Sequence, residues 1–181
     1  MSRNAVSTDR MAAFEATVLP HINAAYNLAR WLTRNQQDAE DVVQESYLRA
    51  LRAFDTFQAG RDGRAWLLAI VRNTCYTWLN KNRARDMYPL NAEDAQQTAS
   101  TRLDPETQLM DKAAAERIRG AVADIGAEYR EVLILREFEG LSYKEIAQIV
   151  GAPLGTVMSR LSRARKELQT RLCASAWQAK K

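Results

Sequence analysis

Histidine and cysteine are scarce in this chain of 181 residues, which holds one His and two Cys. Zinc-type metal sites and Ser-His-Asp triads need these side chains in groups, so the sequence predicts no metal ligands, no cofactor and no catalytic residues. Cys75 and Cys173 lie far apart and fit small hydrophobic positions in a reducing compartment better than a disulfide framework. His21, directly after Pro20, is expected at the surface or at its boundary.

Glycine, proline and long apolar runs are also scarce. Only 7 Gly and 4 Pro are present, and runs of β-branched residues are few, which predicts an all-α fold. No apolar run approaches the length of a membrane span, and the first residues lack a signal-peptide core. We therefore expect no membrane insertion and a cytoplasmic location.

The charge balance is mildly basic, with a net charge of +4 and a pI near 9.2. Hydrophobic residues make up 46% and charged residues 27% of the chain, which is typical of a folded, water-soluble protein. A basic balance permits binding to nucleic acid without proving it.

Residues 140–166 carry the most specific pattern, that of a helix-turn-helix. Ser142 and Glu145 have the spacing of a capping box, which starts a helix. Gly151 can take the positive φ that ends it, and Pro153 is tolerated in the first turn of the next helix. In that second helix an apolar stripe of Val157, Leu161, Ala164 and Leu168 faces one way.

The opposite face of the second helix carries short polar and basic side chains, the kind that enter the DNA major groove. Such faces are more often merely solvated, but the tight turn before this one favours DNA binding. The predicted contacts with DNA are Thr156, Met158, Ser159, Arg160, Ser162, Arg163 and Lys166.

The chain divides into two helical blocks, residues 9–85 and 105–172, joined by a flexible, net acidic linker at 86–104. In the first block Pro20 predicts a kink, and Asp38 is expected to cap a helix that runs through Phe54. A turn with two glycines then leads to a third helix. Trp66 and Trp78 fall on its apolar stripe and are expected in the core.

Four stretches, in order and in both blocks, resemble the extracytoplasmic-function (ECF) sigma factors of the sigma-70 superfamily. They are DAEDVVQESYLRAL (38–51), RAWLLAIVRN (64–73), YREVLILR (129–136) and GTVMSRLSRAR (155–165). The resemblance implies a transcription initiation factor that is not an enzyme. It also implies that the blocks are sigma regions 2 and 4, which recognise the −10 and −35 promoter elements.

The resemblance assigns roles to particular residues. The face of Asp41, Gln44 and Glu45 would dock on the clamp of the largest polymerase subunit. The basic strip with Arg61, Arg64, Arg72 and Asn73 would hold the melted −10 strand, whose flipped base is expected in a pocket near residues 57–63. Met158 and Ser162 depart from the common family pattern, in which a Lys or Arg is frequent at the first position and a larger side chain at the second.

The partners implied by the resemblance are core RNA polymerase (its clamp and its flap region), promoter DNA and an anti-sigma factor. The acidic linker would thread toward the polymerase active centre. Two alternatives remain open from the residues alone. One is a stand-alone helix-turn-helix regulator, which would bind duplex DNA tightly by itself. The other is a metal-dependent nucleic-acid enzyme that uses Asp41 and Glu45, around which no further ligand is arranged.

Overall fold

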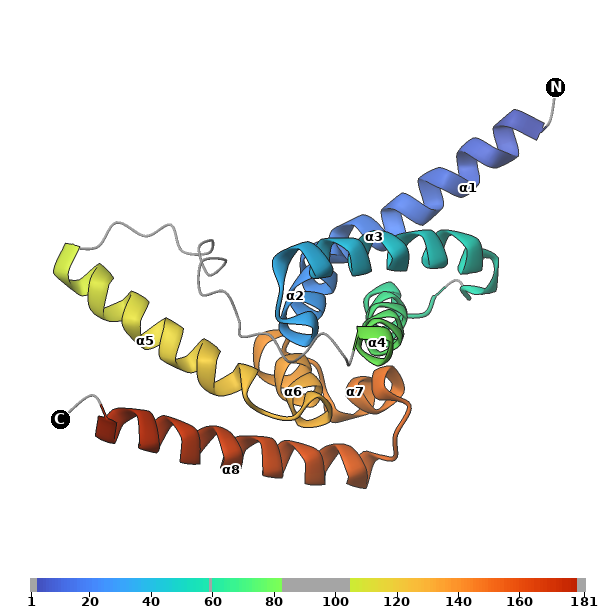
Figure 1. Cartoon of the computed structure of the whole chain (residues 1–181). Helices are drawn as coiled ribbons and strands as arrows, with labels where there is room; N and C mark the ends of the chain where they lie inside the picture. Colours follow the sequence, from blue (N-terminus) through green and yellow to red (C-terminus); the bar gives the residue numbers. More distant parts are fainter. Residues whose placement is uncertain (1–2, 59, 83–104, 179–181) are drawn as a thin grey trace.

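The computed structural model describes the backbone of residues 3–58, 60–82 and 105–178, and every regular element in these ranges is helical (Figure 1). The predicted all-α class is therefore confirmed. The predicted linker at 86–104 lies outside the described residues.

The first group of helices spans residues 3–82. It consists of α1 (Arg3–Val18), the 3₁₀ turn η1 (Leu19–His21), α2 (Ile22–Thr33), α3 (Gln36–Ala53), the 3₁₀ turn η2 (Phe54–Thr56) and α4 (Gly63–Asn82). Pro20 lies in η1 and separates α1 from α2, as predicted. His21 is half-buried at the same junction, which agrees with a boundary position.

The expected cap of α3 is wrong. Asn35, not Asp38, is the N-cap: its backbone is extended and its side-chain oxygen accepts a hydrogen bond from the Asp38 backbone N–H at 3.0 Å. Asp38 lies in the first turn instead, where a carboxylate is favourable beside the positive end of the helix dipole. Asn is as good a cap as Asp, so propensity could not distinguish positions three residues apart.

Aromatic rings fill the centre of the first group. Phe14 of α1 is fully buried and meets the rings of Tyr47 and Phe54 edge to face, at centroid distances of 5.1 and 5.3 Å. Trp66 lies 5.1 Å from the Phe57 ring, and both Trp66 and Trp78 are partly buried against the core, as predicted. This aromatic layer fixes the loop between η2 and α4 at both ends.

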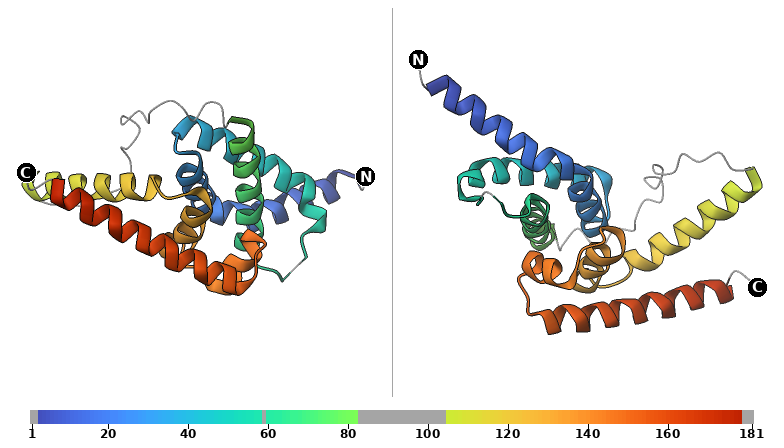
Figure 2. Two further views of the ribbon diagram at one scale, coloured as in Figure 1. Left: turned by 60° about the horizontal axis from the view of Figure 1, so that its bottom comes forward. Right: turned by 180° about the vertical axis from the view of Figure 1, so that it is seen from behind.

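The second group spans residues 105–178. It consists of α5 (Pro105–Ala123), α6 (Ala127–Leu133), the π-helical turn η4 (Ile134–Phe138), α7 (Tyr143–Val150) and α8 (Leu154–Gln178). Helix α5 and the later part of α8 lie side by side and extend beyond the other helices, whereas the start of α8 packs on α6 and α7 (Figure 2). Helices α7 and α8 form the predicted helix-turn-helix.

The local signals of that motif are confirmed. The Ser142 N–H donates to the Glu145 carboxylate at 2.6 Å, and the Glu145 N–H donates to the Ser142 hydroxyl at 3.3 Å. Gly151 ends α7 at φ +65°, a left-handed conformation that favours glycine. Pro153 directly precedes α8, and its carbonyl accepts from Thr156 and Val157.

The two groups pack against each other, with α6 and α7 lying under α2 and α4 (Figure 1). The buried Arg130 of α6 donates to the Trp31 carbonyl of α2 at 2.8 Å, and the rings of Trp31 and Phe138 lie 5.4 Å apart. The buried apolar residues of both groups form one continuous cluster. This interface brings residues of the two predicted DNA-binding surfaces together.

Candidate nucleic-acid interface

The outer face of α8 is open, as the apolar stripe predicted. Val157, Leu161 and Ala164 are buried against the other helices, whereas Met158, Ser159, Ser162, Arg163 and Lys166 are exposed. Thr156 is half-buried at the start of the helix. The face thus presents short polar side chains together with longer ones, including the cations of Arg163 and Lys166.

Arg160 does not belong to that open face. Its guanidinium lies 3.0 Å from the Glu128 carboxylate and 3.6 Å from that of Glu131, and only 24% of the side chain is exposed. In this conformation Arg160 points toward α6, so it is unavailable to DNA. The helical period of α8 predicts Arg160 close to the polar face. It cannot show that Glu128 and Glu131 of α6 lie within reach of its guanidinium.

The other cations of α8 differ in how strongly they are held. Arg163 is well exposed, with its guanidinium 5.0 Å from the centre of the Tyr129 ring and 3.4 Å from Glu167. Lys166 is exposed beside it. Arg165 is bound by Glu137 of η4 at 2.7 Å. Exposed ion pairs of this kind are weak, so Arg163 can leave its partners for a base or phosphate.

The predicted melting residues are divided by the contact between the two groups of helices. Arg61 and Asn73 are exposed. Arg64 donates to both the carboxylate and the backbone carbonyl of Glu139, at 2.6 and 2.9 Å. Arg72 donates two hydrogen bonds to the carboxylate of Glu131, from Nε at 2.9 Å and from Nη2 at 3.3 Å. Two cations of α4 are therefore paired with acids of the second group.

Glu131 is the centre of this arrangement. Its side chain is fully buried and faces both Arg72 from α4 and Arg160 from α8. Burial raises the pKa of the Glu131 carboxyl, and the guanidinium of Arg72 opposes that rise. Arg72 also lies 4.4 Å from the centre of the Tyr76 ring, a cation–π contact. One carboxylate thus holds a predicted −10 residue and a predicted −35 residue at once.

A separate acidic face lies on α3. Asp41 and Gln44 are exposed, and Glu45 is half-buried with its carboxylate 2.7 Å from Arg49. The hydrogen bond from Arg49 lowers the pKa of Glu45, which keeps its carboxylate charged. Leu48 lies one turn further along the same face and is 49% exposed. Sequence reasoning missed Leu48, although its i+7 spacing from Asp41 would have revealed it.

Metal-ligand clusters and membrane-spanning helices are absent from the described part of the chain. No group of three or more His, Cys, Asp or Glu side chains there could hold a metal ion. Among the same residues no helix is long and apolar enough to cross a membrane. Cys75 is buried, and burial raises the pKa of its thiol to about 12.

A helix-turn-helix with an open polar face, packed on a second helical group with its own cationic helix, defines a two-part helical DNA-binding protein. Comparison with known proteins makes the class specific. Sigma-70 region 2 matches residues 17–85, and sigma-70 region 4 matches residues 115–168.

Two curated relatives are similar over most of the chain. The ECF RNA polymerase sigma factor SigE of Mycolicibacterium smegmatis is 32% identical over 159 residues, which cover 88% of this chain and 61% of that protein. The ECF RNA polymerase sigma-E factor of Haemophilus influenzae is 32% identical over 151 residues, which cover 80% and 79% of the two chains. The chain belongs to the ECF sigma factors of the sigma-70 family, which are transcription initiation factors and not enzymes.

Two solved structures share the fold. The sigma factor RpoE in its complex with the anti-sigma factor NepR, from Bartonella quintana, gives a TM-score of 0.72 at 29% identity, covering 88% of this chain and 96% of that one. CnrH in complex with the cytosolic domain of CnrY gives 0.63 at 28% identity, covering 91% and 90%. The family decides against the stand-alone regulator and the metal-dependent enzyme that the residues alone left open.

Proposed function

We propose that this ECF sigma factor has three functional parts: region 2 at residues 9–85, a linker at 86–104 and region 4 at 105–172. Region 2 binds core RNA polymerase and captures the melted −10 element. Region 4 recognises the −35 element. The observation that carries the proposal is the Glu131 cluster, in which one buried carboxylate pairs with Arg72 of α4 and with Arg160 of α8.

The polymerase-docking surface is the face of α3 that carries Asp41, Gln44 and Glu45. Two carboxylates and an amide suit a basic partner rich in hydrogen-bond donors, and the exposed Leu48 adds an apolar centre to the same face. The face is free of the contact between the two groups of helices, so it can engage the polymerase in the conformation described. The clamp of the largest subunit is the proposed partner, and the flap region is the proposed partner of region 4.

The −10 surface consists of Arg61, Arg64, Arg72 and Asn73 with the loop before α4. The −35 surface is the outer face of α8, with Thr156, Met158, Ser159, Ser162, Arg163 and Lys166 in reach of DNA. Arg160 joins this surface only when its pairing with Glu128 and Glu131 is broken. The cations supply phosphate contacts, and the short side chains allow close approach to the bases.

The −10 surface cannot act fully while the two regions are packed together. Arg64 and Arg72 donate to acids of region 4, and a guanidinium cannot bind those carboxylates and a DNA phosphate in the same geometry. Phosphates must therefore compete with Glu139 and Glu131. We propose that α4 separates from α6 and α7 when the chain engages polymerase and promoter.

An anti-sigma factor is a further proposed partner. One solved neighbour is bound to an anti-sigma factor and the other to the cytosolic domain of CnrY, and both share most of their fold with this chain. A partner that binds regions 2 and 4 together would hold the paired arrangement. The proposed location is the cytoplasm, where polymerase and promoter are found.

Run-off transcription tests the proposed function. The purified chain is combined with core polymerase and a promoter library, and start sites are mapped with and without the chain. We expect a set of promoters that share −35 and −10 elements to be transcribed only when the chain is present. Tight footprints from the chain alone, with no effect on transcription by the core enzyme, would contradict the proposal.

Two substitutions separate base recognition from phosphate binding on α8. Arg163→Ala is expected to relax the preference at one or two base pairs of the −35 element, because a bidentate Arg–guanine contact is worth about 1–3 kcal/mol. Lys166→Ala is expected to weaken binding to all −35 sequences by the same factor, because phosphate contacts carry no base information. The measurement is holoenzyme binding across a −35 library; a uniform loss in both variants would rule out direct base contact by Arg163.

A further inference from the structure

The N-terminal turns of α8 carry an apolar edge. Leu154 and Met158, four residues apart, are 42% and 51% exposed, and they are the large hydrophobic side chains exposed on the described part of this helix. Side chains at i and i+4 lie on the same face of a helix. Two adjacent exposed apolar side chains on a face otherwise made of Ser, Gly and cations suggest an apolar contact with a ligand.

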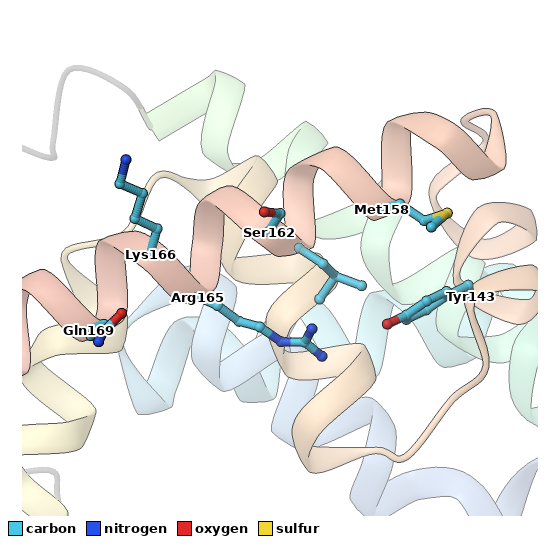
Figure 3. A pocket seen from close by; sticks show the side chains of 7 residues that line it. Tyr143, Met158, Ser162, Arg165, Lys166 and Gln169 are labelled. Carbon is cyan, nitrogen blue, oxygen red and sulfur yellow. The ribbon is translucent and has the colours of Figure 1, made fainter.

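Met158 borders an open groove of about 440 Å³ between α7 and α8 (Figure 3). Tyr143 of α7 forms the opposite wall, and Ser162, Arg165 and Lys166 follow along α8. In Figure 3 Met158 lies beside Tyr143, whereas Lys166 and Gln169 lie at the other end of the groove. The groove is therefore apolar near the start of the helix and cationic further along.

Two cations at or beside this groove already have partners. Arg165 is bound by Glu137 at 2.7 Å, and Arg136 lies 5.0 Å from the centre of the Tyr143 ring. The Ser159 hydroxyl donates to the Thr156 carbonyl of its own helix at 2.9 Å. The thioether of Met158 has no hydrogen-bonding requirement to satisfy, so its exposed surface is free to meet an apolar group.

The major groove of DNA offers one such group, the 5-methyl of thymine. A recognition helix contacts base edges through its N-terminal residues, which is where Met158 lies. We propose that Met158 recognises a thymine of the −35 element through its 5-methyl group, and so selects a T·A pair. This inference rests on the proposed −35 role of α8.

Replacing single −35 thymines by uracil tests the contact, because uracil lacks the methyl group but keeps every hydrogen-bonding group. The burial of one methyl-sized group corresponds to about a fourfold change in a binding constant. At one thymine position we expect uracil to weaken holoenzyme binding by about this factor. With Met158→Ala the same exchange is expected to have no effect, whereas Met158→Leu should retain the sensitivity.

The outcomes separate this inference from the proposed function. Protection of the −35 duplex with no sensitivity to uracil at any position would overturn the role of Met158 and leave region 4 as the −35 reader. Equal sensitivity in wild type and Met158→Ala would assign the methyl to another side chain and also overturn it. If the −35 element that the holoenzyme prefers contains no thymine, the proposed role of Met158 is also overturned. Absence of any −35 protection would instead contradict the proposed function. Because Met158 is exposed, its variants are expected to fold.

Discussion

Replacing both Asp41 and Glu45 by lysine is expected to weaken binding to core polymerase by about 2 kcal/mol or more, which is at least 30-fold. Both side chains lie on the accessible face of α3, and reversal of their charge places cations against a basic partner. The pair between Glu45 and Arg49 is an exposed i,i+4 pair, so its loss costs the helix little. Affinity is measured by equilibrium titration of labelled chain with core polymerase.

A matched control uses the same change of charge on another helix. Asp9 and Glu15 are exposed on α1, and their replacement by lysine raises the net charge by the same four units. Affinity in this control is expected to stay within a few-fold of wild type. If both double variants bind core polymerase as wild type does, docking through Asp41 and Glu45 is wrong.

Replacement of residues 58–61, in the loop before α4, is expected to abolish promoter opening while binding to duplex DNA survives. Glycines let this loop reshape around a flipped base, and Gly60 already has φ +90°. Unstacking a base costs a few kcal/mol, so without capture the opened fraction should fall by about two orders of magnitude. The measurement is permanganate reactivity of promoter thymines in the holoenzyme complex, and a premelted promoter should restore transcription.

The replacement should cover residues 58–61 and keep Asp62 and Gly63. The Asp62 carboxylate accepts from the Arg64 backbone N–H at 2.8 Å, near the start of α4. A side chain at Gly63 would approach the Thr17 backbone carbonyl to 2.9 Å, so any other residue there would disturb the packing of α1. Asn73→Ala, on the exposed side of α4, should reduce thymine reactivity without affecting the loop. Wild-type reactivity in the loop variant would place the capture site elsewhere.

Features determined by neighbours in sequence could be predicted. The capping box of Ser142 and Glu145, the turn at Gly151 and the stripe from Val157 to Ala164 each depend on residues within a few positions, and each is confirmed. The open face of α8 followed from that stripe. The cap of α3 could not be predicted, because Asn35 and Asp38 are equally good caps by residue type.

The contacts between the two regions could not be predicted. Arg72 and Glu131 are 59 residues apart, and Arg64 and Glu139 are 75 apart. No helical period relates such positions, and an ion pair leaves no pattern in either partner's own segment. The pattern of α8 predicts Arg160 on the DNA face for the same reason: its ion pair with Glu128 of α6 cannot be read from the residues of α8 alone. The sequence could reveal which side chains are polar, but not which of them already have partners.

The distance between α4 and the second group of helices tests most directly whether the two regions must separate. Spin labels are placed at Asn80 of α4 and Glu116 of α5, both exposed, after Cys173 is replaced by Ser. Cys75 stays unlabelled because it is buried and its thiol has a pKa raised to about 12. Pulsed electron paramagnetic resonance then compares the free chain with the complex of core polymerase and promoter. A single narrow distribution in the free chain that shifts to longer distances in the promoter complex is the expected result. An unchanged distribution in a complex that transcribes would contradict the proposal that pairing through Glu131 must break.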